Sequence, residues 1–148
     1  MTGSPMDMAL ALAEEAAAAA EAPVGAIIVE NGTVIAADRN RMRELNDPTA
    51  HAELLAIRTA LAKRGTGRLD GCDLYVTLEP CAMCAGAMAH ARVRRLTYGA
   101  GDPKAGGVDH GVRLFDSPNT HHHPEVISGI GEKRAGELLK SFFARLRD

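Results

Sequence analysis

The sequence of 148 residues predicts an α/β fold in which a mixed β-sheet has helices on both faces. A hairpin signal in the first quarter of the chain predicts two antiparallel strands. Beyond it, helical and strand-like segments alternate, which indicates a mixed sheet with helices on both faces. Aromatic residues make up only 3% of the sequence, so we expect an aliphatic core. Neither a repeat nor a linker interrupts the chain, and residues 1–148 are expected to form one domain.

The N-terminal segment predicts a helix followed by a strand. Ser4 fits the capping position, Pro5 the first helical position and Asp7 the acidic first turn. Alanine-rich sequence continues this helix to Glu21, and a proline two residues later ends it. Residues 24–29 are apolar and partly β-branched, as expected for a buried strand.

A turn signal at Asn31-Gly32 predicts a type I′ hairpin that returns the chain antiparallel over residues 33–37. The further elements are expected in this order: a helix that opens at Asp47-Pro48, has His51 and Glu53 near its start and ends at about Lys63; a strand at 73–78; a helix from about Cys81; a strand at 95–99; a loop at 100–124 with one helical turn near 112–115; a strand at 125–128; and an amphipathic helix at 132–146. A loop as long as residues 100–124 is usually functional in a compact domain.

The charge distribution bears on the partners of the chain. The formal net charge is −2, but residues 1–38 contain six acids and neither Lys nor Arg. The remaining residues therefore hold all 17 bases and 13 of the 19 acids, a net charge of +4. This basic part suits either a local phosphate-binding surface or the solvated faces of helices, and charge alone does not decide between them.

Cysteine content and hydropathy indicate the compartment. Three cysteines, an odd number, argue against a secreted disulfide framework. No apolar run approaches the roughly 20 residues that cross a bilayer, and the N-terminus lacks the positive start of a secretory signal. We therefore expect a cytoplasmic enzyme without membrane contact.

Two short segments contain the residue types of a metal site, namely His51-Ala52-Glu53 and Pro80-Cys81-Ala82-Met83-Cys84. Cys81 and Cys84 are three residues apart, so on one helical turn their sulfur atoms point to the same side. A helix N-terminus also favours both thiolates. With His51 they make three zinc ligands, and because zinc prefers four, the fourth position stays open to water, as in a catalytic site.

Glu53 lies two residues after His51, within reach of that water, and is predicted to move its protons. The pattern H-x-E followed by P-C-x-x-C is typical of zinc-dependent nucleobase deaminases. A thioredoxin-like redox pair would not need the segment that contains His51 and Glu53. A structural zinc site would need a fourth ligand, and the remaining cysteine, Cys72, is expected to be a buried free thiol.

Two further features have a structural interpretation at this stage. The run of three histidines at residues 121–123 is expected to lie in a loop, with contact to nucleic acid or a second metal as alternatives. Glu79 is expected to hydrogen-bond the turn beneath the cysteines, a structural role in preference to a catalytic one.

Longer blocks of sequence surround these residues: A-P-V-G-A at 22–26, N-D-P-T-A-H-A-E at 46–53, L-Y-V-T-L-E-P-C-A-M-C-A-G-A at 74–87 and S-F-F at 141–143. In these blocks, which span nearly the whole length, the chain resembles the bacterial tRNA-specific adenosine deaminases. The resemblance implies the cytidine deaminase-like fold, a three-layer α/β/α sandwich around a mixed five-stranded sheet whose last two strands are parallel.

The same resemblance implies an activity and its partners. It implies hydrolytic conversion of adenosine to inosine at the wobble position of an arginine tRNA, with the target base turned out of the anticodon loop into the zinc pocket. It also implies one Zn²⁺ per subunit and a homodimer in which the partner subunit lies close to the active site.

Five residues match RNA-contacting positions of the family. Asn40 matches a residue that hydrogen-bonds the target base, and is otherwise an asparagine in a loop between strand and helix. Asp102 matches an acid that contacts the anticodon loop. Phe142, Phe143 and Arg145 fall on the last helix, where family members contact RNA, although one Phe equally suits the core.

Two other functions fit parts of the pattern. The zinc ligands also suit a free nucleobase or nucleoside deaminase acting on cytosine or guanine, against which the longer blocks and the C-terminal helix speak. A non-catalytic zinc-stabilised RNA-binding domain would have no use for Glu53. The acidic N-terminal third and the histidines at 121–123, where relatives have an Asn-His-Arg-like stretch, depart from the family's pattern.

Overall fold

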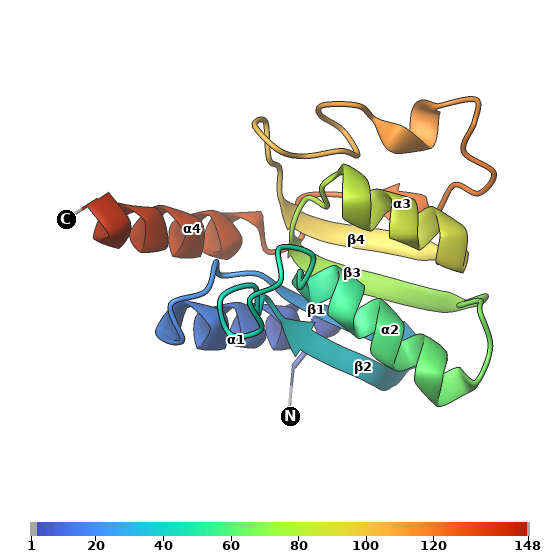
Figure 1. Cartoon of the computed structure of the whole chain (residues 1–148), viewed down its shortest axis with the longest axis horizontal. Coiled ribbons are helices and arrows are strands. Elements are labelled where there is room, and N and C mark those ends of the chain that lie inside the picture. The colour runs from blue at the N-terminus through green and yellow to red at the C-terminus, as the bar shows by residue number, and fades with distance from the viewer. Residues whose placement is uncertain (1–2, 148) are drawn as a thin grey trace.

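The computed structural model describes residues 3–147, and its five strands form one mixed sheet between two layers of helices (Figure 1). The elements are α1 (Pro5–Ala18), β1 (Gly25–Glu30), β2 (Thr33–Arg39), α2 (Ala52–Arg64), β3 (Cys72–Leu78), α3 (Ala82–Ala91), β4 (Arg95–Ala100), the short 3₁₀ helix η1 (Leu114–Asp116), β5 (Glu125–Ile127) and α4 (Glu132–Arg147). The predicted α/β class is confirmed. No helix between residues 3 and 147 is long and apolar enough to span a bilayer.

The strand order in the sheet is β2-β1-β3-β4-β5. β1 pairs antiparallel with both β2 and β3, whereas β3 with β4 and β4 with β5 are parallel pairs. The two parallel pairs require crossover connections, which α3 and residues 101–124 provide. The mixed sheet with its last two strands parallel is therefore confirmed.

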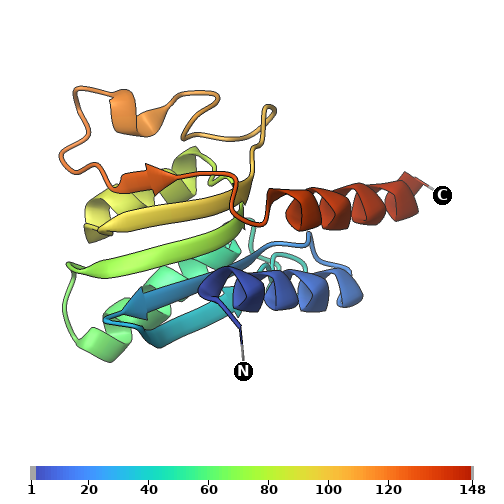
Figure 2. The ribbon, with the colours of Figure 1, turned by 180° about the vertical axis from the view of Figure 1, so that it is seen from behind.

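The helices cover both faces of the sheet, which confirms the predicted three-layer sandwich. α2 and α3 lie on the face turned to the viewer in Figure 1, and α1 and α4 lie on the opposite face, seen in Figure 2. The core between the sheet and α2 and α3 is largely aliphatic, as the composition predicts, and includes the fully buried Ile28, Leu74, Val76, Met88 and Leu96. α1 packs a second, smaller cluster against the sheet, with Met6, Ala9, Ile27 and Val29.

The hairpin between β1 and β2 has the predicted turn. Asn31 and Gly32 both have positive φ angles, 49° and 77°, as a type I′ turn requires. β2 continues to Arg39, beyond the predicted end at residue 37. This extra length places Asn40 directly after the strand, close to the start of α2.

α1 ends at Ala18, earlier than the predicted end at Glu21. Ala20 has a left-handed backbone with φ 62°, and the Glu21 N–H donates back to the carbonyl of Ala16. This 6→1 hydrogen bond closes the helix before the proline is reached. Alanine rarely adopts a left-handed conformation, so the sequence contains no signal that the helix ends here.

α2 begins at Ala52, so the prediction that the helix opens at Asp47-Pro48 is wrong. The Asp47 carboxylate accepts from the N–H (2.8 Å) and the hydroxyl (2.7 Å) of Thr49, which holds this segment in a turn. The helix starts where Asn40 Oδ1 accepts from the Ala52 N–H at 2.8 Å. His51 is therefore the N-cap residue and does not lie inside the helix.

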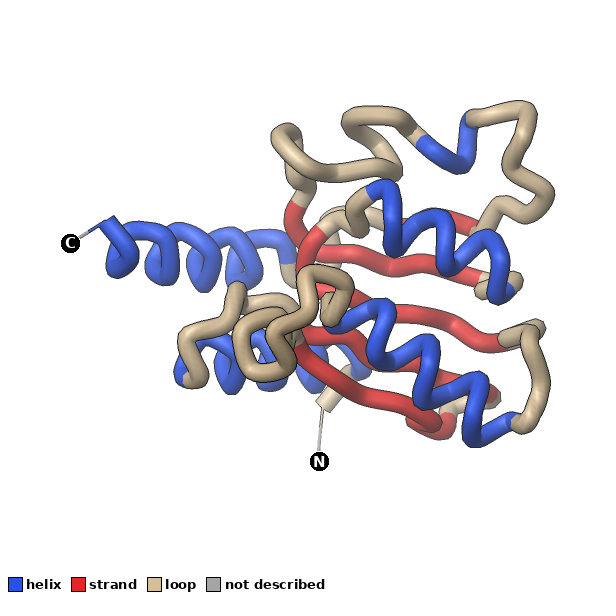
Figure 3. The backbone as a smooth tube through the Cα atoms, in the orientation of Figure 1, coloured by secondary structure: helices blue, strands red, loops and turns tan. Residues whose placement is uncertain are grey.

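The loop before α2 and the loop between β3 and α3 meet at one end of the sheet (Figure 3). This end includes the carboxyl ends of the parallel strands β3 and β4, where binding sites of α/β sheets commonly form. The residues predicted to bind metal are on these two loops and on the first turns of the two helices that follow.

Candidate active site

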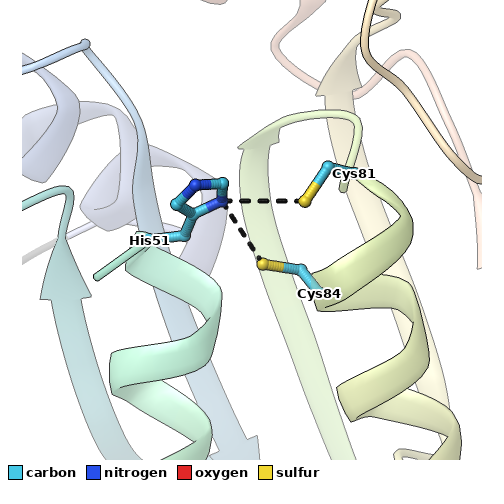
Figure 4. Close-up of side chains that lie close together, drawn as sticks. All are labelled: His51, Cys81 and Cys84. Carbon is cyan, nitrogen blue, oxygen red and sulfur yellow. Dashed lines mark hydrogen bonds between the residues drawn. The ribbon is translucent and has the colours of Figure 1, made fainter. Parts of the chain in front are cut away.

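The candidate metal site is built from the starts of α2 and α3. His51 and Cys81 are the N-cap residues of the two helices, each in an extended conformation and neither making a capping hydrogen bond. Their side chains are thus free to point toward each other across the gap between the helices, and Cys84 joins them from the first turn of α3 (Figure 4). The ligand atoms of all three residues lie within 4.8 Å of one another.

The separations between these atoms fit a tetrahedral zinc ion. His51 Nδ1 lies 3.7 Å from the Cys81 sulfur and 3.6 Å from the Cys84 sulfur. Ordinary Zn–S and Zn–N bonds at tetrahedral angles put sulfur and nitrogen about 3.6 Å apart. No other cluster of three such side chains is found within residues 3–147.

The two thiols favour a cation between them. Hydrogen bonds from Cys84 and His51 lower the pKa of Cys81 to about 4, against the opposing effect of burial. The hydrogen bond with Cys81, together with burial, raises the pKa of Cys84. Without a cation, only one thiol of the pair ionises, whereas a divalent cation stabilises both thiolates. A site of two cysteines and one histidine fits zinc, with one position left for a non-protein ligand.

Glu53 is the second residue of α2 and is 4% exposed. Burial raises the pKa of its carboxyl group to about 7, although the neighbouring His51 opposes the shift. A carboxyl group with a pKa near neutrality can both accept and donate a proton under physiological conditions, as acid–base catalysis requires. Glu53 also lines the pocket, together with His51 and Cys81.

Asn40 has a structural role at the start of α2 and also faces the pocket. The Ala52 N–H is a donor, so the atom opposite it must be the Asn40 oxygen and not its nitrogen. Within the described residues, the Asn40 Nδ2 group makes no hydrogen bond. This orientation leaves a donor available to a ligand.

A cavity of about 710 Å³ surrounds these groups. Its walls come from the loops at the same end of the sheet and from α4, and are formed by Ala22, Val24, Asn40, Met42, His51, Glu53, Leu78, Glu79, Cys81, Gly101, Asp102, Lys104, Ala105, Leu139, Phe143, Leu146 and Arg147. Leu139, Phe143 and Leu146 are spaced so that they share one side of α4. This amphipathic spacing is visible in the sequence, but our interpretation of it missed Leu139 and Leu146.

The predicted RNA-contacting residues are distributed unevenly around this cavity. Asp102 and Phe143 line it, and Phe143 is 47% exposed. Phe142 is buried and packs edge-to-face against Phe143, with ring centres 5.4 Å apart. Its burial leaves it little surface for contact with RNA, so Phe142 is the aromatic residue that belongs to the core. Arg145 is exposed on α4 outside the cavity wall.

Glu79 has the structural role that was predicted, and its partners lie in a loop that follows β4. Its carboxylate accepts hydrogen bonds from the segment 102–110 and not from the turn that holds the cysteines. These hydrogen bonds lower its pKa even though burial alone would raise it.

Cys72 is a buried free thiol, as predicted. The histidines at 121–123 lie in a loop, where His122 Nε2 is 2.6 Å from the Val93 carbonyl oxygen.

Comparison with known proteins identifies the family. Residues 3–147 match the sequence model of a family described as MafB19-like deaminase. The tRNA-specific adenosine deaminase of Agrobacterium fabrum is 54% identical over 142 residues, which cover 96% of this chain and 93% of that protein. That of Bacillus subtilis is 42% identical over 142 residues, 96% of this chain and 88% of that protein.

Solved structures show the same relationship. A structure from a study of A-to-I editing by tRNA:A34 deaminases at the wobble position of transfer RNA is 54% identical, with a TM-score of 0.90 over 91% of this chain and 98% of that chain. A guanine deaminase from Nitrosomonas europaea is 29% identical, with a TM-score of 0.77 over 95% of this chain and 83% of that chain. On the combined strength of fold, site and sequence, this chain belongs to the family of the tRNA-specific adenosine deaminases.

Proposed function

We propose that this chain converts adenosine to inosine at the wobble position of a tRNA by hydrolytic deamination. The observation that supports this most directly is the buried Glu53 beside the His51, Cys81 and Cys84 cluster, where Glu53, His51 and Cys81 line a cavity of about 710 Å³. Identities of 54% to a tRNA-specific adenosine deaminase and to a structure from work on wobble editing supply the substrate.

Zinc is the proposed cofactor, with one ion per subunit held by His51, Cys81 and Cys84. The sulfur–nitrogen separations and the opposed pKa shifts of the two thiols support this choice. When bound, zinc supplies a Lewis acid that makes water a nucleophile near neutral pH.

Glu53 is the proposed proton carrier. The overall reaction adds water to C6 of the adenine ring and releases ammonia, so the protons of water must reach the ring and the leaving amino group. Glu53 accepts a proton from the attacking water and passes it to the ring nitrogen N1. It then assists transfer of the second proton to the departing amino group. A pKa of about 7 suits both directions of transfer.

Substrate binding requires the base to leave the stacked anticodon loop and enter the cavity. Asn40 Nδ2 is a donor for an acceptor atom of the purine, and Asp102 and Arg145 are proposed contacts to the anticodon loop. Phe143 offers an exposed ring for stacking. Phe142 is proposed to act through Phe143, since it packs edge-to-face against that ring.

We also propose that the chain is one catalytic domain, functions in the cytoplasm and forms a homodimer. The exposed apolar side chains of Met83 on α3 and Val112 in the loop before η1 support an interface on this side of the molecule. Sedimentation of the wild type and of Met83→Lys tests it, because a charge in a dimer interface should shift the protein toward monomers.

The decisive experiment compares substrates. Zinc-loaded protein is incubated with an anticodon stem-loop containing a wobble adenosine, and separately with free adenosine, cytosine and guanine. Inosine formation in the stem-loop, with little or no product from the free compounds, is the expected result. Deamination of free guanine or cytosine without inosine in the stem-loop would instead assign the chain to nucleobase metabolism.

A further inference from the structure

Glu79 stands out among the residues that the proposed mechanism does not use. Its side chain has no exposed surface, yet it bears a carboxylate. Oε1 accepts from the Asp102 N–H at 2.9 Å and lies 2.6 Å from His110 Nδ1. Oε2 accepts from the N–H groups of three consecutive residues, Val108, Asp109 and His110, at 2.9 to 3.1 Å.

These contacts reach across both ends of one segment, residues 101–110, which we call the pocket loop. The loop follows β4 and forms part of the cavity wall through Gly101, Asp102, Lys104 and Ala105. Glu79 itself lies between β3 and the metal-binding helix α3. A single carboxylate thus connects the cavity wall to the backbone that leads into Cys81.

The middle of the pocket loop is packed as closely as backbone atoms allow. A Cβ atom on Gly106 would lie 2.5 Å from the Glu79 carboxylate, and one on Gly107 would lie 2.6 Å from the Ala82 nitrogen at the start of α3. The Gly107 N–H also donates to the Pro80 carbonyl at 2.8 Å. Because neither Gly106 nor Gly107 has room for a side chain, the backbone of the loop packs directly against the Glu79 carboxylate and the first turn of α3.

The Glu79 carboxylate is the shared hydrogen-bond acceptor for both ends of the pocket loop. Four backbone N–H groups and one imidazole surround it, and buried backbone donors without a partner are strongly destabilising. The donors come from both the pocket-facing end and the far end of the loop. Removing the acceptor therefore frees the cavity wall while the metal ligands keep their own contacts.

We propose that Glu79 is a positioning residue for substrate: its carboxylate preforms the wall made by Asp102, Lys104 and Ala105, so that the RNA substrate meets an ordered loop. The proposal rests on the proposed function for the identity of that substrate. It predicts that loss of the carboxylate weakens substrate binding and leaves the chemical step intact. The reason is that the Glu79 carboxylate makes its hydrogen bonds to the pocket loop and none to Glu53 or to the metal ligands.

Glu79→Gln tests this selectively. Its amide presents one acceptor oxygen and one NH₂ group where the carboxylate has two acceptors. If the amide oxygen accepts from the N–H groups of residues 108–110, the NH₂ group faces the Asp102 N–H, and two donors then oppose each other. His110 can change its tautomer so that Nδ1 accepts a hydrogen bond from the NH₂ group. The substitution then removes one hydrogen bond in particular, the one that anchors Asp102 in the cavity wall.

Two measurements on the zinc-loaded protein decide the matter. Amide hydrogen exchange should rise at residue 102 and its neighbours in the pocket loop, and stay unchanged in β1, β3 and α2. With the stem-loop substrate, KM should rise about tenfold, the effect of losing about 1.4 kcal/mol of binding free energy, while kcat changes less than about threefold and zinc content is retained. Glu15→Gln, on an exposed part of α1, is the matched control and should match the wild type in both measurements.

His110→Ala is the second variant, because it removes only the imidazole contact and keeps all four backbone donors. Its exchange and KM should stay within about threefold of wild type. The proposal is overturned if His110→Ala reproduces the full effect, if Glu79→Gln leaves exchange in the pocket loop unchanged, or if it lowers kcat or zinc content without raising KM. A wild type that forms no inosine in the stem-loop refutes the proposed function instead, and the exchange data then still decide whether Glu79 holds the loop.

Discussion

At the scale of single residues, the metal site depends on two helix N-cap residues whose side chains make no capping hydrogen bond and face the metal site. The N-cap position has extended backbone angles, which turn its side chain away from the helix axis and usually back toward the first turn. His51 and Cys81 occupy this position without making that bond. The N-termini of the two helices lie next to each other at the site (Figure 4), and their dipoles favour the negative charge of the thiolates.

Glu53→Gln is expected to reduce kcat by at least about 10²-fold, the lower end of what general acid–base catalysis contributes. The amide keeps the size of the side chain but cannot transfer protons. Zinc content and the thermal unfolding midpoint should remain near those of wild type. Loss of zinc together with activity would show that Glu53 supports the metal site and does not move protons.

The buried Glu53 also predicts a pH dependence of stability in zinc-free protein. Its pKa is raised from 4.5 to about 7 in the folded state, so between these pH values the unfolded chain binds fewer protons and stability falls as pH rises. Relative to Glu53→Gln, wild type should lose about 3 kcal/mol across this window. Urea unfolding of both zinc-stripped proteins at pH 4.5, 6 and 7.5 measures the difference. A difference independent of pH would contradict the buried, protonated state.

The sequence predicts the metal cluster better than the residues that support it. Cys81 and Cys84 follow from short-range spacing, since a helical turn brings positions three apart to one side. His51, 30 residues before Cys81, follows from the H-x-E and P-C-x-x-C pattern, and the structure places the three ligand atoms together. The contacts of Glu79 join it to residues 23 to 31 positions away. Such partners depend on how the strands pair and where a long loop returns, which no local pattern specifies.

At the scale of elements, the strands were predicted to within two residues, and the larger errors lie at helix ends. Apolar, β-branched runs and an Asn-Gly turn are strong local signals for β1 and β2. The end of α1 depends on a left-handed Ala20, and the start of α2 on a hydrogen bond from Ala52 to Asn40 in another element. The first feature is a local backbone conformation that alanine rarely adopts, and the second is a tertiary contact, so the residue pattern placed both ends wrongly.

Gly25→Ala tests how tightly these elements pack. A Cβ atom at Gly25 would lie 2.1 Å from the Ala9 carbonyl oxygen and 2.7 Å from the Leu12 Cβ, so α1 would have to move away from β1. We expect a loss of about 1–3 kcal/mol in the free energy of unfolding, measured by urea titration.

Gly67→Ala is the control for this substitution, because no atom lies within 4 Å of the added Cβ. It should leave stability unchanged or raise it by up to about 1 kcal/mol, since alanine restricts the unfolded chain. Equal stability of Gly25→Ala and wild type would mean that α1 is less closely packed against β1 than these distances indicate.

At the scale of the whole molecule, an acidic protein must bind an anionic substrate. The net charge of −2 gives no general attraction to RNA, and the bases outside the first 38 residues must act locally. α4 extends past the end of the sheet (Figures 1 and 2), and its Arg147 lines the cavity together with Lys104 of the pocket loop. Lys104 and Arg147 both line the cavity, and we call these two residues its basic rim.

Lys104→Ala should reveal this rim through salt dependence. Binding of a single-stranded loop weakens with salt in proportion to the phosphates neutralised, by about 0.7 in the slope of log K against log salt for each one. Fluorescence anisotropy of the labelled stem-loop at several salt concentrations should therefore give a slope smaller by about 0.7 for Lys104→Ala. Lys63→Ala, at the far end of α2 from His51, removes the same charge without touching the cavity and should keep the wild-type slope. Equal slopes for both variants would mean that the net charge of the protein, and not the rim, sets the salt dependence.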